Sequence, residues 1–491
     1  MLTKQSTKIE LSVRSEFPGY DRGDSIESAY LNCALRAPMC PDGDRKPVDI
    51  VVVLDRSGSM AGKRLHLCKE TIRFLMGELS AFDRLGLITY DSKIRTEFGL
   101  MKMDEIGKEK TEQTLKKINA GDRTNLSGGL MAGIQEVQKP TRSDEQEPNP
   151  VRSVLILTDG LANQGITKTS ELVKLVQGML EPNVSVFTFG YGSNHNVDML
   201  RAISEVGSGV YYFVQNVDGV SIAFADCLGG LLSVVAQNIN VEFFAMNGCK
   251  IKAIKTRKSK KVVVPHQHYT LELGDLYGEE ERDVLIEMSM PSLPSENLES
   301  EVLKCRVSYI NVLDSSLDQV EAFAVVRRPN ELTASDRVPD SRITQQLNRI
   351  LSLEALEIAT IAAEGGDLSE GTEVLQRAMN QMTDKMKFLN DEDTIVSNAL
   401  MDDLKECKGG LASQSMYKNR GKMRMKAKIQ GHWNQRSNEA ELNLDQIMKE
   451  SDQSCSVPTS ASSVSVSGYR NETKKRMLSK AIGFPSPNLP K

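Results

Sequence analysis

Three oxygen-bearing side chains lie close together in the sequence, where an apolar run ends. In VDIVVVLDRSGSM, residues 48–60, Asp55, Ser57 and Ser59 occupy alternate positions directly after the run. One such residue is common in a turn or as a helix cap. Three of them at this spacing can point to one place as a strand curls into a loop. Their hard oxygens suit Mg²⁺, Mn²⁺ or Ca²⁺ better than zinc.

Two further oxygen donors fall at matching places later in the chain. Thr124, in GDRTNLSGG, precedes a predicted helix, and Asp159, in LILTDG, ends a predicted strand. Ligands of open parallel sheets bind at the carboxyl ends of the strands, so these donors should meet Asp55 there. Hydroxyls do not neutralise a cation, and the two aspartates would supply the charge, directly or through water. The sequence predicts a Mg²⁺ site and leaves Mn²⁺ and Ca²⁺ open.

The elements that would position these residues alternate between short apolar strands and helical stretches over 46–236. The expected strands cover 49–54, 84–90, 153–158, 184–190 and 210–214, with an antiparallel edge strand at 94–100. The expected helices cover 63–78, 104–118, 125–138, 168–180, 196–206 and 217–236. Apolar strands separated by helices indicate an α/β, Rossmann-like fold with a mostly parallel sheet covered on both faces.

The motifs DRSGSM, the Thr-Asn of GDRTNLSGG and ILTDG resemble the metal-ion-dependent adhesion site of von Willebrand factor type A domains. The resemblance covers about 46–236. It implies that Ser57, Ser59 and Thr124 coordinate the ion directly, and that Asp55 and Asp159 act directly or through water. It also implies that one coordination position is kept for an acidic residue of a partner protein. We therefore expect a metal-ion-dependent protein-binding module and not an enzyme.

The remaining chain predicts three further regions. Strand-like segments in 1–45 and 237–330 suit one antiparallel β-sandwich, into which the α/β domain would be inserted. Apolar residues at helical spacing predict a helical unit over 341–433, interrupted at EGGD. Beyond it, 434–491 is Ser-rich and lacks periodicity, which predicts a disordered tail.

A broader resemblance connects the chain with plant intracellular type A proteins, including the wavy-growth group of RING-type ubiquitin ligases. In those proteins the RING precedes the type A domain. Residues 1–47 contain Cys33, Cys40 and no histidine, so no RING can form there. One alternative is therefore a RING-less, substrate-binding component of a ubiquitin ligase. A second is a secreted matrix-type protein resembling inter-alpha-trypsin inhibitor heavy chains.

Composition narrows the class of partner. A net charge of −5 over 491 residues gives no indication of nucleic acid binding, and no apolar run reaches membrane-spanning length. The N-terminus has no apolar core of a signal peptide, and the 8 cysteines are scattered without a C-x-x-C. We expect a cytoplasmic protein with free thiols that binds a protein partner and no membrane. The sequence does not indicate the oligomeric state.

Several other residues were considered as site candidates. His266 and His268 stand two apart on one face of a predicted strand and suit surface or turn positions, and His195 suits a structural place in a loop, with contact to a partner as its alternative. The basic stretch 418–428 suits a solvated helix face, with binding of an acidic ligand as its alternative. Trp433 is expected to pack on the helical unit. No phosphate-binding G-x-x-x-x-G-K-[ST] occurs, and no Ser–His–Asp triad can be assembled.

Overall fold

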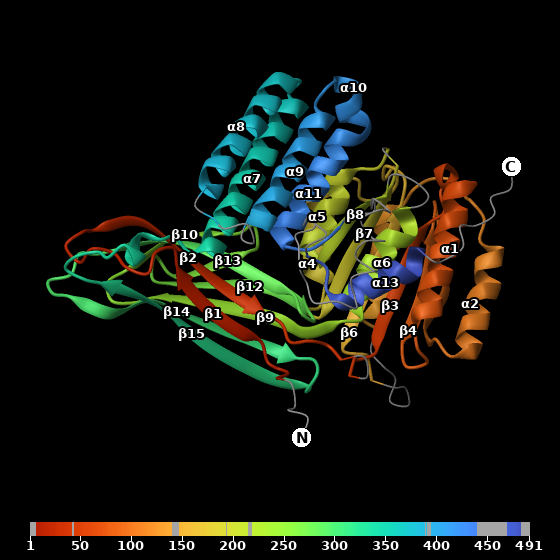
Figure 1. The fold of residues 1–491 in the computed structure, drawn as a ribbon. Helices are drawn as coiled ribbons and strands as arrows, with labels where there is room; N and C mark the ends of the chain where they lie inside the picture. The colour runs from red at the N-terminus through yellow and green to blue at the C-terminus, as the bar shows by residue number, and fades with distance from the viewer. Residues whose placement is uncertain are drawn as a thin grey trace.

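The protein has three layered parts, an α/β part, a pair of antiparallel sheets and a helical unit (Figure 1). The computed structural model describes residues 6–41, 44–139, 147–192, 194–214, 219–387, 389, 394–438 and 469–482. The helical unit packs against both the α/β part and the antiparallel sheets, as the contacts of its first and last helices show.

The α/β part is built on a six-stranded sheet of order β5-β4-β3-β6-β7-β8. Its strands are β3 (Val48–Asp55), β4 (Arg84–Tyr90), β5 (Ile94–Lys102), β6 (Val151–Thr158), β7 (Val184–Tyr191) and β8 (Ser208–Val214). β5 is antiparallel to β4, and the other pairs are parallel. β3 and β6 are neighbours and buried along their whole length. The predicted mostly parallel sheet with an antiparallel edge strand is confirmed.

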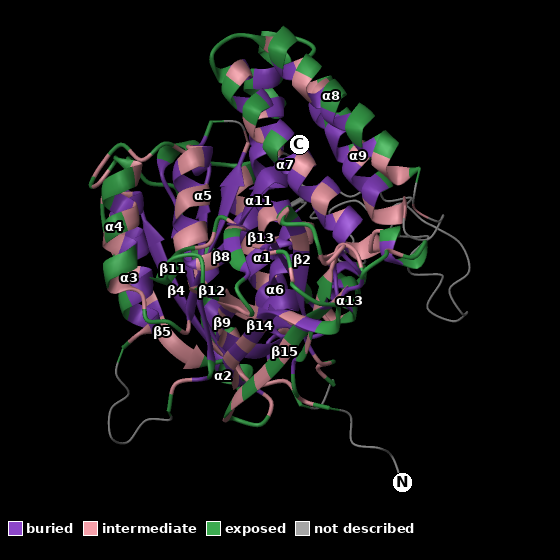
Figure 2. Cartoon of the chain, turned by 90° about the vertical axis from the view of Figure 1, so that its left-hand side faces the viewer, coloured by how far each residue is buried: buried purple, intermediate pink, exposed green. Residues whose placement is uncertain are grey.

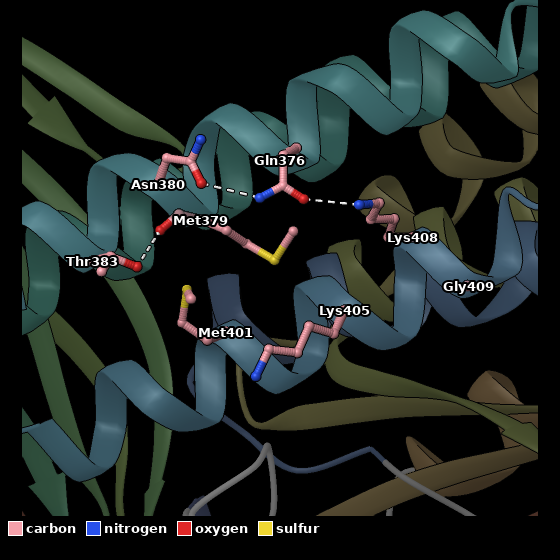
Figure 3. Close-up of a pocket in the computed structure, with 8 residues that line it drawn as sticks. All are labelled: Gln376, Met379, Asn380, Thr383, Met401, Lys405, Lys408 and Gly409. Carbon is pink, nitrogen blue, oxygen red and sulfur yellow. Dashed lines mark hydrogen bonds between the residues drawn. The ribbon is translucent and has the colours of Figure 1, made fainter.

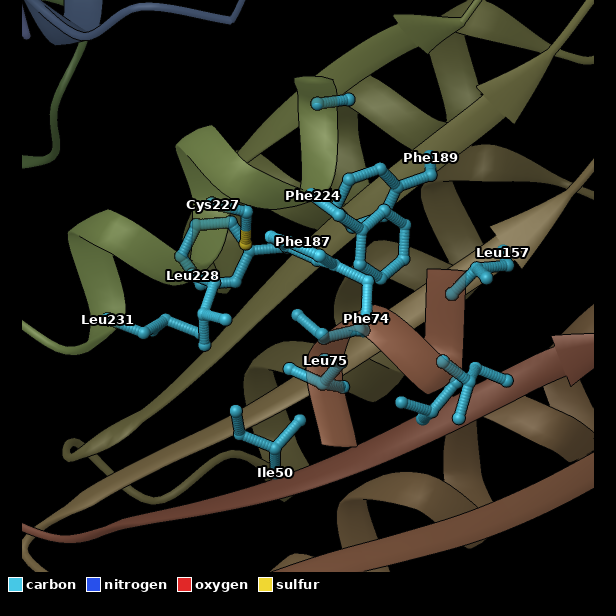
Figure 4. Close-up of a cluster of buried hydrophobic side chains, with 14 of the residues drawn as sticks. Ile50, Phe74, Leu75, Leu157, Phe187, Phe189, Phe224, Cys227, Leu228 and Leu231 are labelled. Carbon is cyan, nitrogen blue, oxygen red and sulfur yellow. The ribbon is translucent and has the colours of Figure 1, made fainter. Parts of the chain in front are cut away.

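Helices cover both faces of this sheet. They are α1 (Lys63–Glu78), α2 (Glu105–Lys117), α3 (Leu126–Val137), α4 (Thr169–Met179), α5 (Val197–Val206) and α6 (Gly219–Leu231). α1, α2 and α6 share one buried cluster, whereas α3, α4 and α5 belong to the cluster on the other face. Figure 4 shows Phe74 of α1 and Phe224 of α6 beside Phe187 of β7. The helix expected over 217–236 ends early because Val234 already begins the next strand.

Two antiparallel sheets combine segments from before and after the α/β part. One has the order β1-β2-β13-β10 and the other β11-β12-β9-β14-β15. The strands are β1 (Glu10–Ser15), β2 (Ile26–Arg36), β9 (Val234–Ala245), β10 (Lys250–Lys255), β11 (Lys260–Val264), β12 (His268–Tyr277), β13 (Glu281–Met290), β14 (Asn297–Asn311) and β15 (Ser316–Arg328). One apolar cluster contains residues of both sheets, so they form a sandwich. β2 pairs with β13, which joins chain segments about 250 residues apart.

The helical unit follows a 3-10 turn, η2 (Ser335–Arg337). It contains α7 (Ser341–Glu364), α8 (Leu368–Met386), α9 (Thr394–Gly410), α10 (Gln414–Met416), the π-helical turn η3 (Tyr417–Gly421) and α11 (Lys422–Asn434). The predicted break at EGGD separates α7 from α8. Figure 2 shows that the buried sides of these helices face inward. Within the described residues, no helix combines the length and apolar character that a membrane crossing needs.

The basic stretch 418–428 is only in part the solvated helix face that the sequence favoured, since Lys418 and Arg420 are exposed but the basic residues of α11 are paired. Lys426 is buried and pairs with Asp198 of α5 and with Glu364 of α7. Lys428 is buried against Asp403 of α9. The charges of α11 are therefore satisfied by acidic residues from three other helices, and they attach the helical unit to the α/β part.

The described parts of 434–491 are packed, which corrects the predicted disordered tail. Residues 434–438 are buried, and α13 (Glu472–Ile482) contributes Met477 and Leu478 to the core beside α1 and α6. Residues 439–468 and 483–491 lie outside the described residues. The helix was missed because its apolar positions are few and its neighbours are Ser-rich.

A buried charge cluster holds α13 on α6. Asp226 of α6 is inaccessible to solvent and accepts a hydrogen bond of 2.9 Å from Lys474 Nζ, with Arg470 at 3.3 Å. Burial alone would raise the Asp226 pKa, but the charges of Lys474 and Arg470 lower it. Lys474 of α13 and Arg470, which precedes that helix, therefore supply the cations that allow an aspartate inside this layer.

We predict that Lys474→Ala lowers the free energy of unfolding by about 3–5 kcal/mol, because it leaves the Asp226 carboxylate under-compensated in the interior. The matched control is Lys475→Ala, since Lys475 is half exposed and pairs with Glu472 on the same helix. It should change the stability by less than about 0.5 kcal/mol. Urea unfolding followed by circular dichroism measures both. Equal stabilities for the two variants would contradict a structural role for the cluster.

Candidate metal centre

The five residues singled out in the sequence lie at one edge of the six-stranded sheet. Asp55 is the last residue of β3, and Asp159 follows β6, its neighbour in the sheet. Ser57 and Ser59 lie in and beside the short 3-10 turn η1 (Gly58–Met60), and Thr124 precedes α3. Ser59 is exposed while the other four are buried. The group is thus open to solvent on the Ser59 side.

Hydrogen bonds bring the donor oxygens together. Ser59 Oγ donates to Asp159 Oδ1 at 2.8 Å, and Ser57 Oγ lies 3.2 Å from Ser59 Oγ. Thr124 Oγ1 and Ser59 Oγ lie 3.5 and 3.6 Å from the point where a Cβ on Gly160 would stand. Three hydroxyls and two carboxylates therefore converge. Hydroxyls outnumber carboxylates in this donor set. Among the described residues no group of three or more His, Cys, Asp or Glu is placed to hold a metal.

Asp55 is fixed by donors on both of its oxygens. The Ser57 amide donates to Oδ1 at 2.8 Å, and Thr158 Oγ1 donates to Oδ2 at 2.6 Å. Burial raises the Asp55 pKa to about 6, these hydrogen bonds offset part of the increase, and the negative charge of Asp159 adds to it. A buried carboxyl whose pKa is raised partly by the charge of a second aspartate marks a place that a cation would stabilise.

The three loops that carry these residues are tied to one another through the backbone. The Gly58 amide donates to the Asp122 carbonyl at 2.9 Å, which joins the first loop to the second. Thr124 exchanges two hydrogen bonds with Asn163, one from its amide to the Asn163 side chain at 2.9 Å and one accepted from the Asn163 amide at 3.1 Å. The hydroxyl of Thr124 is therefore positioned by the loop that carries Asp159.

A buried ion pair beneath the first loop was missed in the sequence. Arg56, which separates Asp55 from Ser57, pairs with Asp91 at the end of β4 and donates to the Asn119 carbonyl at 3.2 Å. Both partners are buried. A charged residue inside an otherwise small-residue motif was the signal that could have indicated it.

A second missed residue, Arg64, contacts the donor set itself. It lies in the first turn of α1, and its Nη1 contacts Asp159 Oδ2 and the Ser59 carbonyl, the latter at 3.3 Å. Its side chain is 41% exposed, whereas the Asp159 side chain is fully buried. A basic residue five positions after Ser59 is visible in the sequence, but nothing local indicates its partner.

The histidines lie apart from this group. His195 is buried, its Nε2 is 2.6 Å from the Tyr211 hydroxyl, and burial lowers its pKa to about 4, so it is a neutral structural residue. The structural role that the sequence favoured for His195 therefore fits its burial better than contact with a partner does. His266 lies in an exposed turn, as the sequence favoured, whereas His268 begins β12, is half-buried and lies 3.1 Å from Glu242 on the neighbouring strand β9.

A hollow between α8 and α9 also lies apart from the donor set (Figure 3). Met379 and Met401 face each other across it, and Lys408 closes one end through a hydrogen bond of 2.8 Å to Gln376. None of the five donor residues lines it. It therefore takes no part in the chemistry at the sheet edge.

Residues 49–224 match the family model of the von Willebrand factor type A domain, so the chain contains this domain. Among solved structures, a von Willebrand factor type A protein from Catenulispora acidiphila covers 83% of this chain and 91% of its own, with a TM-score of 0.62 and 15% identity. That likeness shows the fold alone.

Two curated relatives are similar in sequence. The E3 ubiquitin-protein ligase WAV3 of Arabidopsis thaliana is 30% identical over 322 residues, which cover 65% of this chain and 39% of that protein. The inter-alpha-trypsin inhibitor heavy chain H1 of Mesocricetus auratus is 26% identical over 162 residues, or 33% and 18% of the two chains. The match thus spans about two fifths of WAV3.

The raised pKa of Asp55 generates a pH-dependent prediction. The folded protein holds the Asp55 proton more tightly than the unfolded chain, whose ordinary value is 3.8. Its stabilising contribution is present below pH 3.8 and is lost as pH rises through 6. In chelator at pH 8, Asp55→Asn should therefore be more stable than wild type by about 1–3 kcal/mol. The gain should shrink as pH falls from 6 to 4.

Urea unfolding in chelator at a series of pH values checks this. The exposed Asp402 on α9 offers a control, since Asp402→Asn removes the same charge from solvent. Asp402→Asn should leave the free energy of unfolding nearly unchanged across the same pH series. A stability gain for Asp55→Asn that does not change between pH 8 and pH 4 would show that the Asp55 charge is not destabilising.

Proposed function

We propose that this von Willebrand factor type A domain is a metal-ion-dependent protein-binding module. A divalent cation at the sheet edge, Mg²⁺ with Mn²⁺ or Ca²⁺ as alternatives, would be held by Ser57, Ser59 and Thr124. Asp55 and Asp159 would hold it directly or through water. The observation that carries the proposal is the convergence of these hydroxyls on two buried aspartates at the end of neighbouring strands.

The donor set fits a hard dication on chemical grounds. All five side chains offer oxygen, and two negative charges match a charge of +2. In cation-free form the Asp55 carboxylate is costly, as its raised pKa shows, and Asp159 adds to that cost. When bound, the cation supplies a Lewis-acidic centre for a further oxygen ligand. The chain's own residues hold and orient it and leave the Ser59 side open.

The partner would supply a carboxylate to that open side. A carboxylate is a hard, charged oxygen ligand of the kind that these cations prefer, and protein surfaces offer it widely. Leu161, two residues after Asp159, is 57% exposed and gives the rim an apolar contact. We place the protein in the cytoplasm as part of the same proposal, and we assign it no catalytic role.

A second candidate function is substrate binding for a ubiquitin ligase. It is favoured by the similarity to WAV3, because the 322 aligned residues extend beyond the type A domain at 49–224. In this form the chain would bind a substrate while a separate subunit carries the RING. Recovery of ubiquitinated proteins on the immobilised chain, lost on addition of chelator, would support it.

A secreted matrix-type role is favoured less, because the similarity on which it rests covers a smaller part of the chain than the similarity to WAV3 does. The similarity to the inter-alpha-trypsin inhibitor heavy chain covers 33% of the chain. Seven cysteines in the described residues are free thiols, and six of them are buried, which suits a reducing compartment.

The main proposal predicts that metal affinity and partner binding fall together. Asp55→Ala removes a negative charge and an orienting group, so Mg²⁺ and Mn²⁺ affinity should fall at least about tenfold, or 1.4 kcal/mol. Thr124→Ala should weaken binding of the cation without removing a charge from the site. Isothermal titration calorimetry measures the affinity for Mg²⁺ and Mn²⁺. Affinity purification from lysate, with and without chelator, measures metal-dependent binding of partners.

Thr114→Ala is the matched control for Thr124→Ala, since Thr114 is a half-buried threonine of α2 in the same domain, and its hydroxyl donates only to the Lys110 carbonyl of its own helix at 2.8 Å. It should keep wild-type affinity for Mg²⁺ and Mn²⁺. If Asp55→Ala keeps its metal affinity, or retains the same proteins in chelator as in Mg²⁺, the group at the sheet edge is not a working adhesion site.

A further inference from the structure

Arg64 occupies a place in the donor set that no ligand role explains. Its guanidinium contacts Asp159 Oδ2, while the other oxygen of Asp159 accepts a hydrogen bond from Ser59 Oγ at 2.8 Å. The carboxylate of Asp159 is thus shared between a hydroxyl and a positive charge. Any cation bound to the same carboxylate, directly or through water, must stand close to that guanidinium.

Arg64 is held in this position from two sides. Nη1 also donates to the carbonyl of Ser59 at 3.3 Å. Nη2 lies 3.3 Å from the point where a Cβ on Gly192 would stand, and Gly192 has a φ of +66°. The arginine therefore lies between the ends of β6 and β7, beside the group of hydroxyls.

Two consequences follow from charge. A guanidinium beside a dication repels it, so Arg64 lowers the affinity of the site for the metal alone. A guanidinium beside a dication attracts an incoming carboxylate, and its planar fork can donate to the oxygen that the metal does not bind. Since the side chain is 41% exposed, it is accessible to such a ligand.

We propose that Arg64 couples the cation to the partner: it opposes the metal in the free protein and donates to the partner's carboxylate in the complex. The inference rests on the proposed function and assigns to the site a preference for a carboxylate over a neutral oxygen ligand. Binding of the carboxylate transfers the hydrogen bonds of Arg64 from Asp159 to the ligand. Asp159, released from the guanidinium, would then be available to hold the cation.

The test uses the full chain and Mn²⁺, with free Mn²⁺ followed by electron paramagnetic resonance. Arg64→Gln should bind Mn²⁺ about tenfold more tightly than wild type. Acetate serves as the carboxylate probe, and its displacement of water from bound Mn²⁺ is followed by proton relaxation. The acetate concentration for half displacement should rise about fivefold in Arg64→Gln. Opposite signs in the two measurements distinguish this role from a simple loss of structure.

Two further variants make the result specific. Lys63→Gln removes the same charge from the exposed neighbouring position and should bind Mn²⁺ within about twofold of wild type. Arg64→Lys keeps the charge without the planar fork, so its Mn²⁺ affinity should match wild type and its acetate binding should be weaker. This variant tests the proposal if Arg64→Gln does not fold.

The outcomes separate the inference from the function on which it rests. If Arg64→Gln binds Mn²⁺ no more tightly than wild type, or if Arg64→Lys binds acetate as wild type does, the coupling role is wrong and the metal site stands. If wild type does not bind Mn²⁺ at all, the proposed function and this inference both fail.

Discussion

The central physical constraint of this protein is a pair of buried aspartates at the ends of neighbouring strands. Asp55 and Asp159 are both removed from water, and burial together with the charge of Asp159 raises the Asp55 pKa. Such a pair is unfavourable unless hydrogen bonds and positive charge surround it. The backbone amide of Ser57, the hydroxyls of Thr158 and Ser59, and the guanidinium of Arg64 meet part of that need within the chain, and the Asp55 pKa stays raised.

The rest of the fold keeps this edge in place. β3 and β6 form the centre of the sheet, and the loops that follow them are joined through Asp122, Thr124 and Asn163. Outside the domain, Gln430 of α11 accepts a hydrogen bond from the Tyr211 amide of β8 at 2.8 Å, and α13 covers α6. The helical unit and the C-terminal helix thus stabilise one edge of the sheet and one of its helical layers.

The donor residues could be predicted because their spacing and their place after apolar strands are local features of the sequence. The α/β architecture follows from the same periodicity. The pairings of Arg56 and Arg64 could not be predicted, because their partners Asp91 and Asp159 follow strands that are distant in the sequence. Lys426 and Lys474 were misjudged for a similar reason. A lysine is usually exposed, and its burial depends on carboxylates, here Asp198 and Asp226, that only the tertiary structure brings near. The role of the five donors as metal ligands stays a prediction.

The most direct test of the central claim is a crystal structure of the full chain with Mn²⁺, in which anomalous scattering locates the ion. The account predicts a single strong anomalous peak at the carboxyl edge of β3 and β6, with Ser57, Ser59 and Thr124 oxygens in its coordination shell and Asp55 and Asp159 in direct or water-mediated contact. A peak elsewhere with none at this edge, in a crystal containing saturating Mn²⁺, would contradict it.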